Sequence, residues 1–262
     1  MSKKNHNLLS LYTPIVVRLI MLVFVVHTVM GTSSIYARGS ASLEKSAKDS
    51  TQWKKDRVIR GFSVFTSKNS KTDIVPIKVE GIIEAPITAI MENLRTIEGS
   101  EDWTPDLVIK KTLKDFGPRK AITYSLTDMP WPLYDRVLIL ENELLLDKER
   151  KLLFVLSKTV PFEKKAIPSS DKTIEALVGY SNMGFRPVSK DKTFVEFTAW
   201  VDPKGSIPSW VINFFQMKWP VTFFEALEER CDEYSPELRP GLKTMLDDLL
   251  KEMDWDPKTF DS

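Results

Sequence analysis

The sequence predicts an α+β fold in which a curved antiparallel sheet wraps around a long C-terminal helix. Two observations support this fold class. Short apolar segments separated by polar turns recur between residues 58 and 201, as expected for a meander of about eight strands. The stretch from Ser209 to Phe224 follows them and is apolar on most of its circumference, so it predicts a helix that is buried on most sides.

The first 37 residues have the order of a secretory signal peptide. Lys3 and Lys4 precede an apolar run at residues 19–30, and small residues follow before Ala37, where we expect cleavage. A helix of that length spans roughly 18 Å, which is shorter than the apolar core of a bilayer, about 30 Å. An uncleaved segment that anchors the protein in a membrane is the alternative. Cleavage predicts a secreted or periplasmic protein, and both interpretations place the body of the protein outside the cytoplasm. Residues 38–52 are expected to be a flexible leader.

Composition excludes several classes of function. Without the first 37 residues, 34 basic residues face 36 acidic ones, so no basic field argues for nucleic-acid binding. His6 and His27 are the only histidines, both lie in the N-terminal segment, and Cys231 is the only cysteine. A processed chain therefore has no residues for a Cys/His metal site or for imidazole catalysis, and we expect no metal and no cofactor. Chemistry that uses carboxylates alone stays possible.

The expected elements begin with a hairpin. Residues 58–66 and 73–84 have strand patterns, with a turn at residues 69–71 between them. Pro86 opens a helix whose apolar positions keep a helical period up to Gly99. Trp103 is expected in the loop that follows.

Six further strands and a second C-terminal helix complete the expected fold. The strands are residues 107–113, 120–126, 136–146, 151–157, 173–181 and 193–201. The longer loops between them are residues 160–172 and 187–192. The second helix begins at Ser235 and Pro236, and its apolar side is expected to pack back onto the domain. We place the folded domain at residues 53–234 and the helical extension at residues 235–262.

A sheet of this size curls, and a curled sheet packed on a helix encloses a volume that is either filled or binds a ligand. One face of the strand at residues 136–146 is mostly apolar. The residues on this face are Leu138, Leu140, Asn142 and Leu144, whereas Glu141 points the other way. One amide among leucines is typical of an apolar ligand pocket, and a packed core with its amide bonded to backbone is the alternative.

Four segments resemble the START family of lipid-binding domains. They are VEGII at residues 79–83, EDW at 101–103, MPWPLYDR at 129–136 and DPKGSIPSWVIN at 202–213. The resemblance covers about residues 57 to 233 of the chain. It implies a helix-grip fold with a single hydrophobic cavity that holds one lipid or sterol, and a C-terminal helix that acts as a lid. It implies no catalysis.

The same resemblance suggests the site. Arg136 falls on the family's motif arginine, but the acidic residue that usually follows it is Val137 here, so Asp135 is its candidate partner and a solvated strand-end charge is the alternative. Sterol-binding relatives carry a carboxylate and a guanidinium near the positions of Ser125 and Asn142, which are neutral here and leave the ligand class open. The candidate ligand-binding residues are Trp103, Ser125, Arg136, Leu138, Leu140, Asn142, Tyr180, Phe197, Trp210, Asn213 and Phe214.

Within this set, the expected roles differ. Ser125, Asn142 and Tyr180 are the candidates for contacts with a polar head group, and a structural role is the alternative for each. Pro220 removes a backbone hydrogen bond from the long helix, so it predicts a kink that acts as a hinge. Trp210 and the neighbouring phenylalanines would roof the cavity, with plain core packing as the alternative.

Three classes of function fit these observations. The first is a monomeric module that binds a single lipid or sterol-like molecule for transfer or sensing, with transient membrane contact. The second is an enzyme of the cyclase or hydrolase type that uses Glu196 or Glu141 in the cavity. The third is a scaffold that binds a protein partner through the corner at Trp131.

Overall fold

The computed structural model of the protein describes residues 53–67, 72–162, 172–252 and 254. The predicted signal peptide at residues 1–37 and the leader at residues 38–52 lie outside this range. No helix within it is long and apolar enough to cross a membrane.

The described part of the chain begins with three strands that form consecutive hairpins: β1 (Trp53–Ile59), β2 (Phe62–Ser67) and β3 (Ile77–Ile83). The prediction of a single strand at residues 58–66 was wrong, because β1 ends and β2 begins within this range. Arg60 and Gly61 both have positive φ, at 49° and 87°, and form a two-residue turn of the kind that joins paired strands. The hairpin expected next is present, because β2 pairs with β3, although its turn at residues 69–71 lies outside the described residues.

Two helices follow, α3 (Ile87–Arg95) and α4 (Ser100–Trp103). Pro86 precedes the first turn of α3, and Ile90 and Met91 are buried on the face that the apolar period predicted. Trp103 was expected in a loop, but it is the last residue of α4. Its ring packs against Phe223, with 5.6 Å between the ring centroids.

The long strands are β4 (Leu107–Asp115), β5 (Lys120–Thr127), β6 (Asp135–Asp147), β7 (Leu152–Thr159), β9 (Leu177–Ser189) and β10 (Lys192–Asp202). The order in the sheet is β1-β2-β3-β10-β9-β7-β6-β5-β4, so the last strand pairs with the third and joins the two halves. All of these pairs are antiparallel.

The structure divides the strand expected at residues 173–181. Its first part is a short separate strand, β8 (Thr173–Glu175), which pairs parallel with β6. Its second part belongs to β9, which continues to Ser189, so the loop expected at residues 187–192 shrinks to a tight turn before β10. The expected antiparallel pairing therefore holds for every strand except β8, although β3 pairs with β10 and not with the next strand in the chain.

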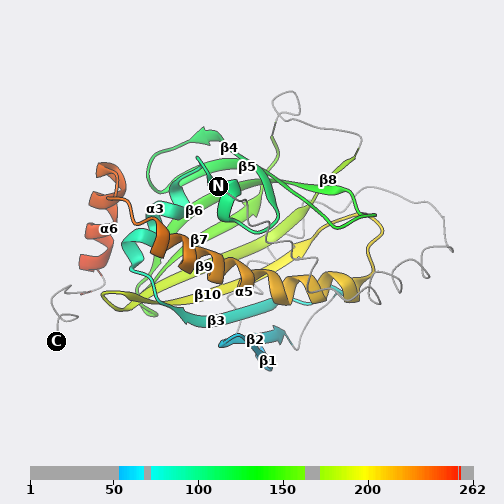
Figure 1. The fold of residues 1–262 in the computed structure, drawn as a ribbon, viewed down its shortest axis with the longest axis horizontal. Coiled ribbons are helices and arrows are strands. Elements are labelled where there is room, and N and C mark those ends of the chain that lie inside the picture. Colours follow the sequence, from blue (N-terminus) through cyan, green and yellow to red (C-terminus); the bar gives the residue numbers. More distant parts are fainter. Residues whose placement is uncertain (1–52, 68–71, 163–171, 253, 255–262) are drawn as a thin grey trace. The chain divides into compact units, whose positions relative to one another are not determined.

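Helix α5 (Ser209–Glu233) lies across the sheet, with β4 and β5 on one side of it and β1, β2 and β3 on the other (Figure 1). We call the face turned toward α5 the inner face and the opposite face the outer face. The C-terminal half of α5 packs on the inner face. Phe224 is fully buried and stacks on Phe62 with 5.8 Å between centroids. This packing forms the main core together with β3, β9 and β10.

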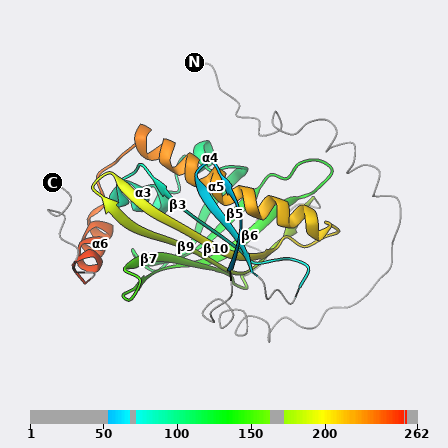
Figure 2. The same ribbon diagram turned by 90° about the horizontal axis from the view of Figure 1, so that it is seen from below.

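The last helix, α6 (Pro240–Glu252), begins later than the expected start at Ser235. It lies beside α3 near the C-terminal end of α5 (Figures 1 and 2). As expected, one side packs back onto the domain, because Leu242, Met245, Leu246 and Leu249 are buried in the main core. An ion pair adds to this contact, since Arg239 Nε, just before α6, lies 2.7 Å from the carboxylate of Glu92, a buried residue of α3.

Phe224→Ala should lower the free energy of unfolding by about 3–5 kcal/mol, because it removes a fully buried ring that α5 uses to grip the sheet. Urea denaturation of the purified protein measures this. Val58→Ala, on the exposed side of β1, is the matched control and should change stability by less than about 0.5 kcal/mol. Equal stability of the two variants would contradict this account of the core.

Candidate functional site on the inner face of the sheet

The two halves of α5 differ in how they meet the inner face. In the C-terminal half, Val221, Phe223, Phe224, Leu227 and Cys231 are buried. In the N-terminal half, Val211 and Ile212 are buried in the first turn, but the side chains from Asn213 to Met217 are only half-buried. Core packing therefore holds the C-terminal half of the helix along its length and leaves the segment from Asn213 to Met217 partly open to solvent.

The inner face shows the same division. Val79, Val195 and Phe185 are fully buried where β3, β9 and β10 meet the core. On β5, β6, β7 and β9, inner-facing side chains remain half-buried: Thr123, Ser125, Leu138, Leu140, Asn142, Val155, Ser157, Ser181 and Met183. Side chains that face a covering helix and still contact solvent mark a surface that the protein's own core does not fill. This part of the inner face is the candidate site.

Asn142 is the centre of a row of polar side chains that crosses the site. Its Nδ2 donates to Thr123 Oγ1 at 2.9 Å and to the Leu140 carbonyl at 3.1 Å, and Ser157 Oγ donates to its Oδ1 at 2.8 Å. The amide is therefore bonded to side chains on both neighbouring strands as well as to backbone. The Thr123 hydroxyl still has a proton to donate, and the Ser157 hydroxyl still has lone pairs to accept.

The inner face changes from apolar to polar toward β4 and β5. Strand pairing places Lys110 opposite Ser125, and Thr112 opposite Thr123, all on the inner face. The apolar side chains of these strands point the other way and form a second, outer cluster. Its members are Ile109, Leu113, Ile122, Tyr124, Leu126, Val137, Ile139, Val160 and Phe162. At this end the sheet packs its apolar side away from α5.

Six of the predicted site residues share the inner face: Ser125, Arg136, Leu138, Leu140, Asn142 and Phe197. Phe197 lies nearest to the core, and its ring centroid is 6.1 Å from that of Trp219 on α5. Tyr180 is not brought to this face. It pairs with Trp200 on the outer face, where burial raises the pKa of its phenol to about 12.

In the described structure Arg136 makes no hydrogen bond or ion pair with Asp135, and it is not solvated. Its side chain is buried and donates to three backbone carbonyls, those of Tyr134, Pro203 and Lys204, the last at 3.0 Å. Burial lowers the pKa of this guanidinium, and Asp135 opposes that effect. Arg136 thus fastens the loop before β6 to the loop that leads into α5.

The predicted site residues on α5 and α4 differ in their contacts and exposure. Asn213 Oδ1 accepts from the Val75 amide and its Nδ2 donates to the Asp73 carbonyl, both at 3.0 Å, so it ties α5 to the segment before β3. Phe214 is half-buried and Trp210 is 58% exposed. Trp103 contacts the buried half of α5 through Phe223, away from the half-buried segment.

The carboxylates proposed for catalysis lie on the outer face. Glu196 is buried there and pairs with Arg150 at 2.6 Å, and Glu141 pairs with Lys120 at 3.1 Å. Within the described ranges, no cluster of His, Cys, Asp and Glu residues is arranged to hold a metal ion. The site contains hydroxyl, amide and ammonium groups, which suit hydrogen bonding to a ligand.

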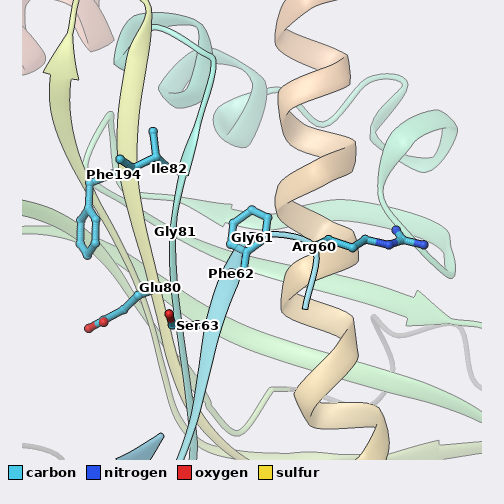
Figure 3. Close-up of a pocket in the computed structure, with 8 residues that line it drawn as sticks. All are labelled: Arg60, Gly61, Phe62, Ser63, Glu80, Gly81, Ile82 and Phe194. Atoms are coloured by element: carbon cyan, nitrogen blue, oxygen red, sulfur yellow. The ribbon is translucent and has the colours of Figure 1, made fainter. Parts of the chain in front are cut away.

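A groove of about 450 Å³ lies elsewhere, between the turn at Arg60 and strands β3 and β10 (Figure 3). Phe62, Ile82 and Phe194 supply its apolar surface. Its charged groups already have partners, because Arg60 pairs with Glu225 and Glu80 with Lys78. None of the predicted site residues lines this groove.

Known proteins with similar sequences or structures agree with this architecture. The chain is 20% identical over 202 residues to the phosphatidylcholine transfer protein of Rattus norvegicus, covering 76% of the chain and 92% of the relative. Human STARD10 superposes with a TM-score of 0.63 at 18% identity, covering 83% of this chain and 91% of that one. The protein has the fold of the START family.

A further relative and one negative result complete the comparison. An uncharacterised protein of Pseudomonas aeruginosa is 25% identical over 151 residues, which cover 58% of this chain and 72% of the relative. No protein-family model matches the chain. The START-type helix-grip fold expected from the sequence is confirmed by the structure and by its structural neighbours.

Sequence reasoning missed several polar residues of this START fold. Thr123, Ser157 and Ser181 follow from strand pairing, which sequence patterns do not supply. Gln216 on α5 donates to the Val201 carbonyl at 3.3 Å, and its Oε1 is buried without a hydrogen bond in the described structure. The apolar residues of the strand that contains Lys110 belong to the outer cluster. Alternation alone would turn these apolar residues toward α5 and would therefore place Lys110 on the outer face.

Arg136→Ala should lower the free energy of unfolding by about 1–3 kcal/mol, because buried carbonyls lose their donor. It should also increase amide hydrogen exchange in residues 203–212, which Arg136 fastens. Hydrogen exchange with mass spectrometry measures the second effect. Arg57→Ala, an exposed charge on β1, is the control for both readouts. Unchanged exchange in this segment would show that Arg136 does not hold the start of α5.

Proposed function

We propose that the protein binds one lipid or other hydrophobic ligand between the inner face and the N-terminal half of α5, for transfer or sensing outside the cytoplasm. The observation that carries the proposal is the half-buried surface of β5, β6, β7 and β9 under a helix whose segment from Asn213 to Met217 is itself only half-buried. The phosphatidylcholine transfer protein found among the relatives supports it.

The composition of the surface suits reversible exchange. A bilayer offers an acyl chain the same burial as a protein site, about 0.8 kcal/mol per CH₂, so transfer of the apolar part is close to balance. Selectivity must then come from polar groups, since a buried group that loses its partner costs about 1–3 kcal/mol. Thr123, Ser125, Asn142 and Ser157 supply such groups beside Leu140.

Entry of a ligand requires movement of α5, and we propose that its N-terminal half is the lid. Pro220 has no amide hydrogen, so the carbonyl four residues earlier, that of Gln216, lacks its helical donor. This weak point lies where the half-buried segment meets the packed segment. Opening at this position leaves the aromatic core of the other half in place.

Two further features support transient membrane contact at the end where α5 begins. Trp131 is 74% exposed on the loop between β5 and β6, and Trp210 is exposed at the start of α5. Arg136 fastens the two loops to each other. We propose that the protein acts without catalysis, because Glu141 and Glu196 lie on the face opposite to the site.

Native mass spectrometry of the full-length protein tests the function directly. We expect a mass adduct that disappears on denaturation and a single class of lipid in the organic extract. A protein that carries no adduct and takes up no labelled lipid from vesicles would overturn the proposal.

Leu140→Trp should reduce uptake of a fluorescent lipid from vesicles at least about tenfold, because the larger ring occupies the inner face that the ligand needs. Val188→Trp, on an exposed position of β9, is the matched control and should leave uptake unchanged. Thermal denaturation of both variants verifies folding. Normal uptake by a folded Leu140→Trp protein would exclude this surface as the site.

Pro220→Ala should slow lipid release several-fold, because it restores a donor to the weak point of α5 and stiffens the proposed hinge. Stopped-flow transfer of a fluorescent lipid from the loaded protein to acceptor vesicles gives the rate. Thr222→Ala, a half-buried neighbour on the same helix, serves as the control. A release rate equal to that of the unmodified protein removes the hinge from the mechanism.

A further inference from the structure

The charges on the inner face are unevenly distributed. On strands β3 to β10 the acidic residues Glu80, Glu141, Glu143 and Glu196 all lie on the outer face. The inner face carries two cations, Lys110 and Arg136, and a single carboxylate, Asp115, at the end of β4.

Two of these three inner-face charges are already satisfied. Asp115 pairs with Arg95 of α3 at 2.6 Å. Arg136 uses its donors on three backbone carbonyls. Lys110 makes no hydrogen bond or ion pair with any residue in the part of the chain that the structure describes.

The surroundings of Lys110 favour a negative ligand group. Its side chain is half-buried, and burial lowers the pKa of its ammonium, with a further lowering by the nearby charge of Arg95. A half-buried cation without a counter-ion is destabilised, and an anion placed beside it relieves that cost. Ser125 lies opposite Lys110 on β5, and its hydroxyl has no hydrogen-bond partner among the residues described.

The inner-face side chains become apolar with distance from Lys110 across the sheet. Ser125 pairs with Leu138 on β6, and the next inner-facing position of that strand is Leu140. Val155 and Met183 continue the surface across β7 and β9 toward Phe197. A molecule with one negative end and a long apolar body matches this order of side chains.

We propose that Lys110 and Ser125 bind the phosphate or carboxylate of an anionic amphiphile whose apolar chain lies along Leu138, Leu140 and Met183. This inference rests on the proposed function and narrows it to ligands with a net negative charge. No inner-face carboxylate is free to pair with a choline or ethanolamine ammonium, since Asp115 on these strands is bound to Arg95. Anionic lipids should therefore bind more tightly than zwitterionic lipids with the same acyl chains.

The test compares Lys110→Met with Lys111→Met in the full-length protein. The two lysines are adjacent on β4, but Lys111 is exposed and pairs with Tyr124 on the outer face. The probes are fluorescent phosphatidylglycerol, phosphatidylcholine and a fatty acid of matched chain length, presented in neutral carrier vesicles. Lys110→Arg keeps the charge, and thermal denaturation verifies that each variant folds.

Lys110→Met should weaken binding of phosphatidylglycerol and of the fatty acid at least about tenfold and change phosphatidylcholine binding less than about twofold. Lys111→Met should change none of the three affinities, and Lys110→Arg should retain most of the anionic binding. Equal affinities of Lys110→Met and the unmodified protein for all probes would overturn the inference while leaving lipid binding intact. Failure of the unmodified protein to bind any probe would instead overturn the proposed function.

A competition arm separates a lipid head group from a free anion. Inorganic phosphate at millimolar concentration should not displace the bound phosphatidylglycerol, because it lacks the apolar chain. Binding of inorganic phosphate that depends on Lys110, measured by titration calorimetry, together with no measurable uptake of anionic lipid, would identify a site for a free anion and contradict the amphiphile.

Discussion

The grip of the C-terminal half of α5 on the inner face is the constraint on which the rest of the structure depends. Phe224 stacks on Phe62, and Trp219 lies against both Phe197 and Phe223. These rings fill the space between the helix and strands β2, β3 and β10, and they fix the position of the helix at one end. The other half of α5 lies over the remaining strands with Val211 and Ile212 buried in its first turn and the side chains from Asn213 to Met217 only half-buried.

The N-terminal half is held by a different kind of interaction. Asn213 makes two hydrogen bonds to the segment before β3, and Gln216 makes one to Val201. Arg136 fastens the loop that precedes the helix. Each hydrogen bond contributes about 1 kcal/mol net, so these contacts can open at a cost well below that of unfolding the aromatic core. The difference between the two halves separates local opening from global stability.

Much of the fold followed from the sequence because periodicity reports local burial. The long helix, the early helix and most strands lie where their apolar patterns predicted. Sequence patterns did not reveal the Arg60–Gly61 turn, because the two short strands on either side of it have the pattern of one continuous strand. They also did not reveal β8, because its pairing with β6 is a long-range contact. Alternation along β6 correctly put Leu138, Leu140 and Asn142 on one face, because that strand has no bulge in either of its antiparallel pairs.

The same rule failed where packing on both faces decides orientation. Tyr180 lies on the outer face beside Trp200, next to a shift in register between β9 and β10 that a single sequence does not show. For Lys110 the rule gave the wrong face for another reason. The apolar side chains of its strand are buried in the outer cluster, and the sequence does not say on which face of the sheet such a cluster will form. That cluster has a consequence for function. Because it stabilises β4, β5 and β6 from the outside, the inner-facing lysine, serine and threonine residues are not needed for the core. Their chemistry is therefore free to be set by a ligand, whereas an inner face that also had to provide the core would have to be apolar throughout.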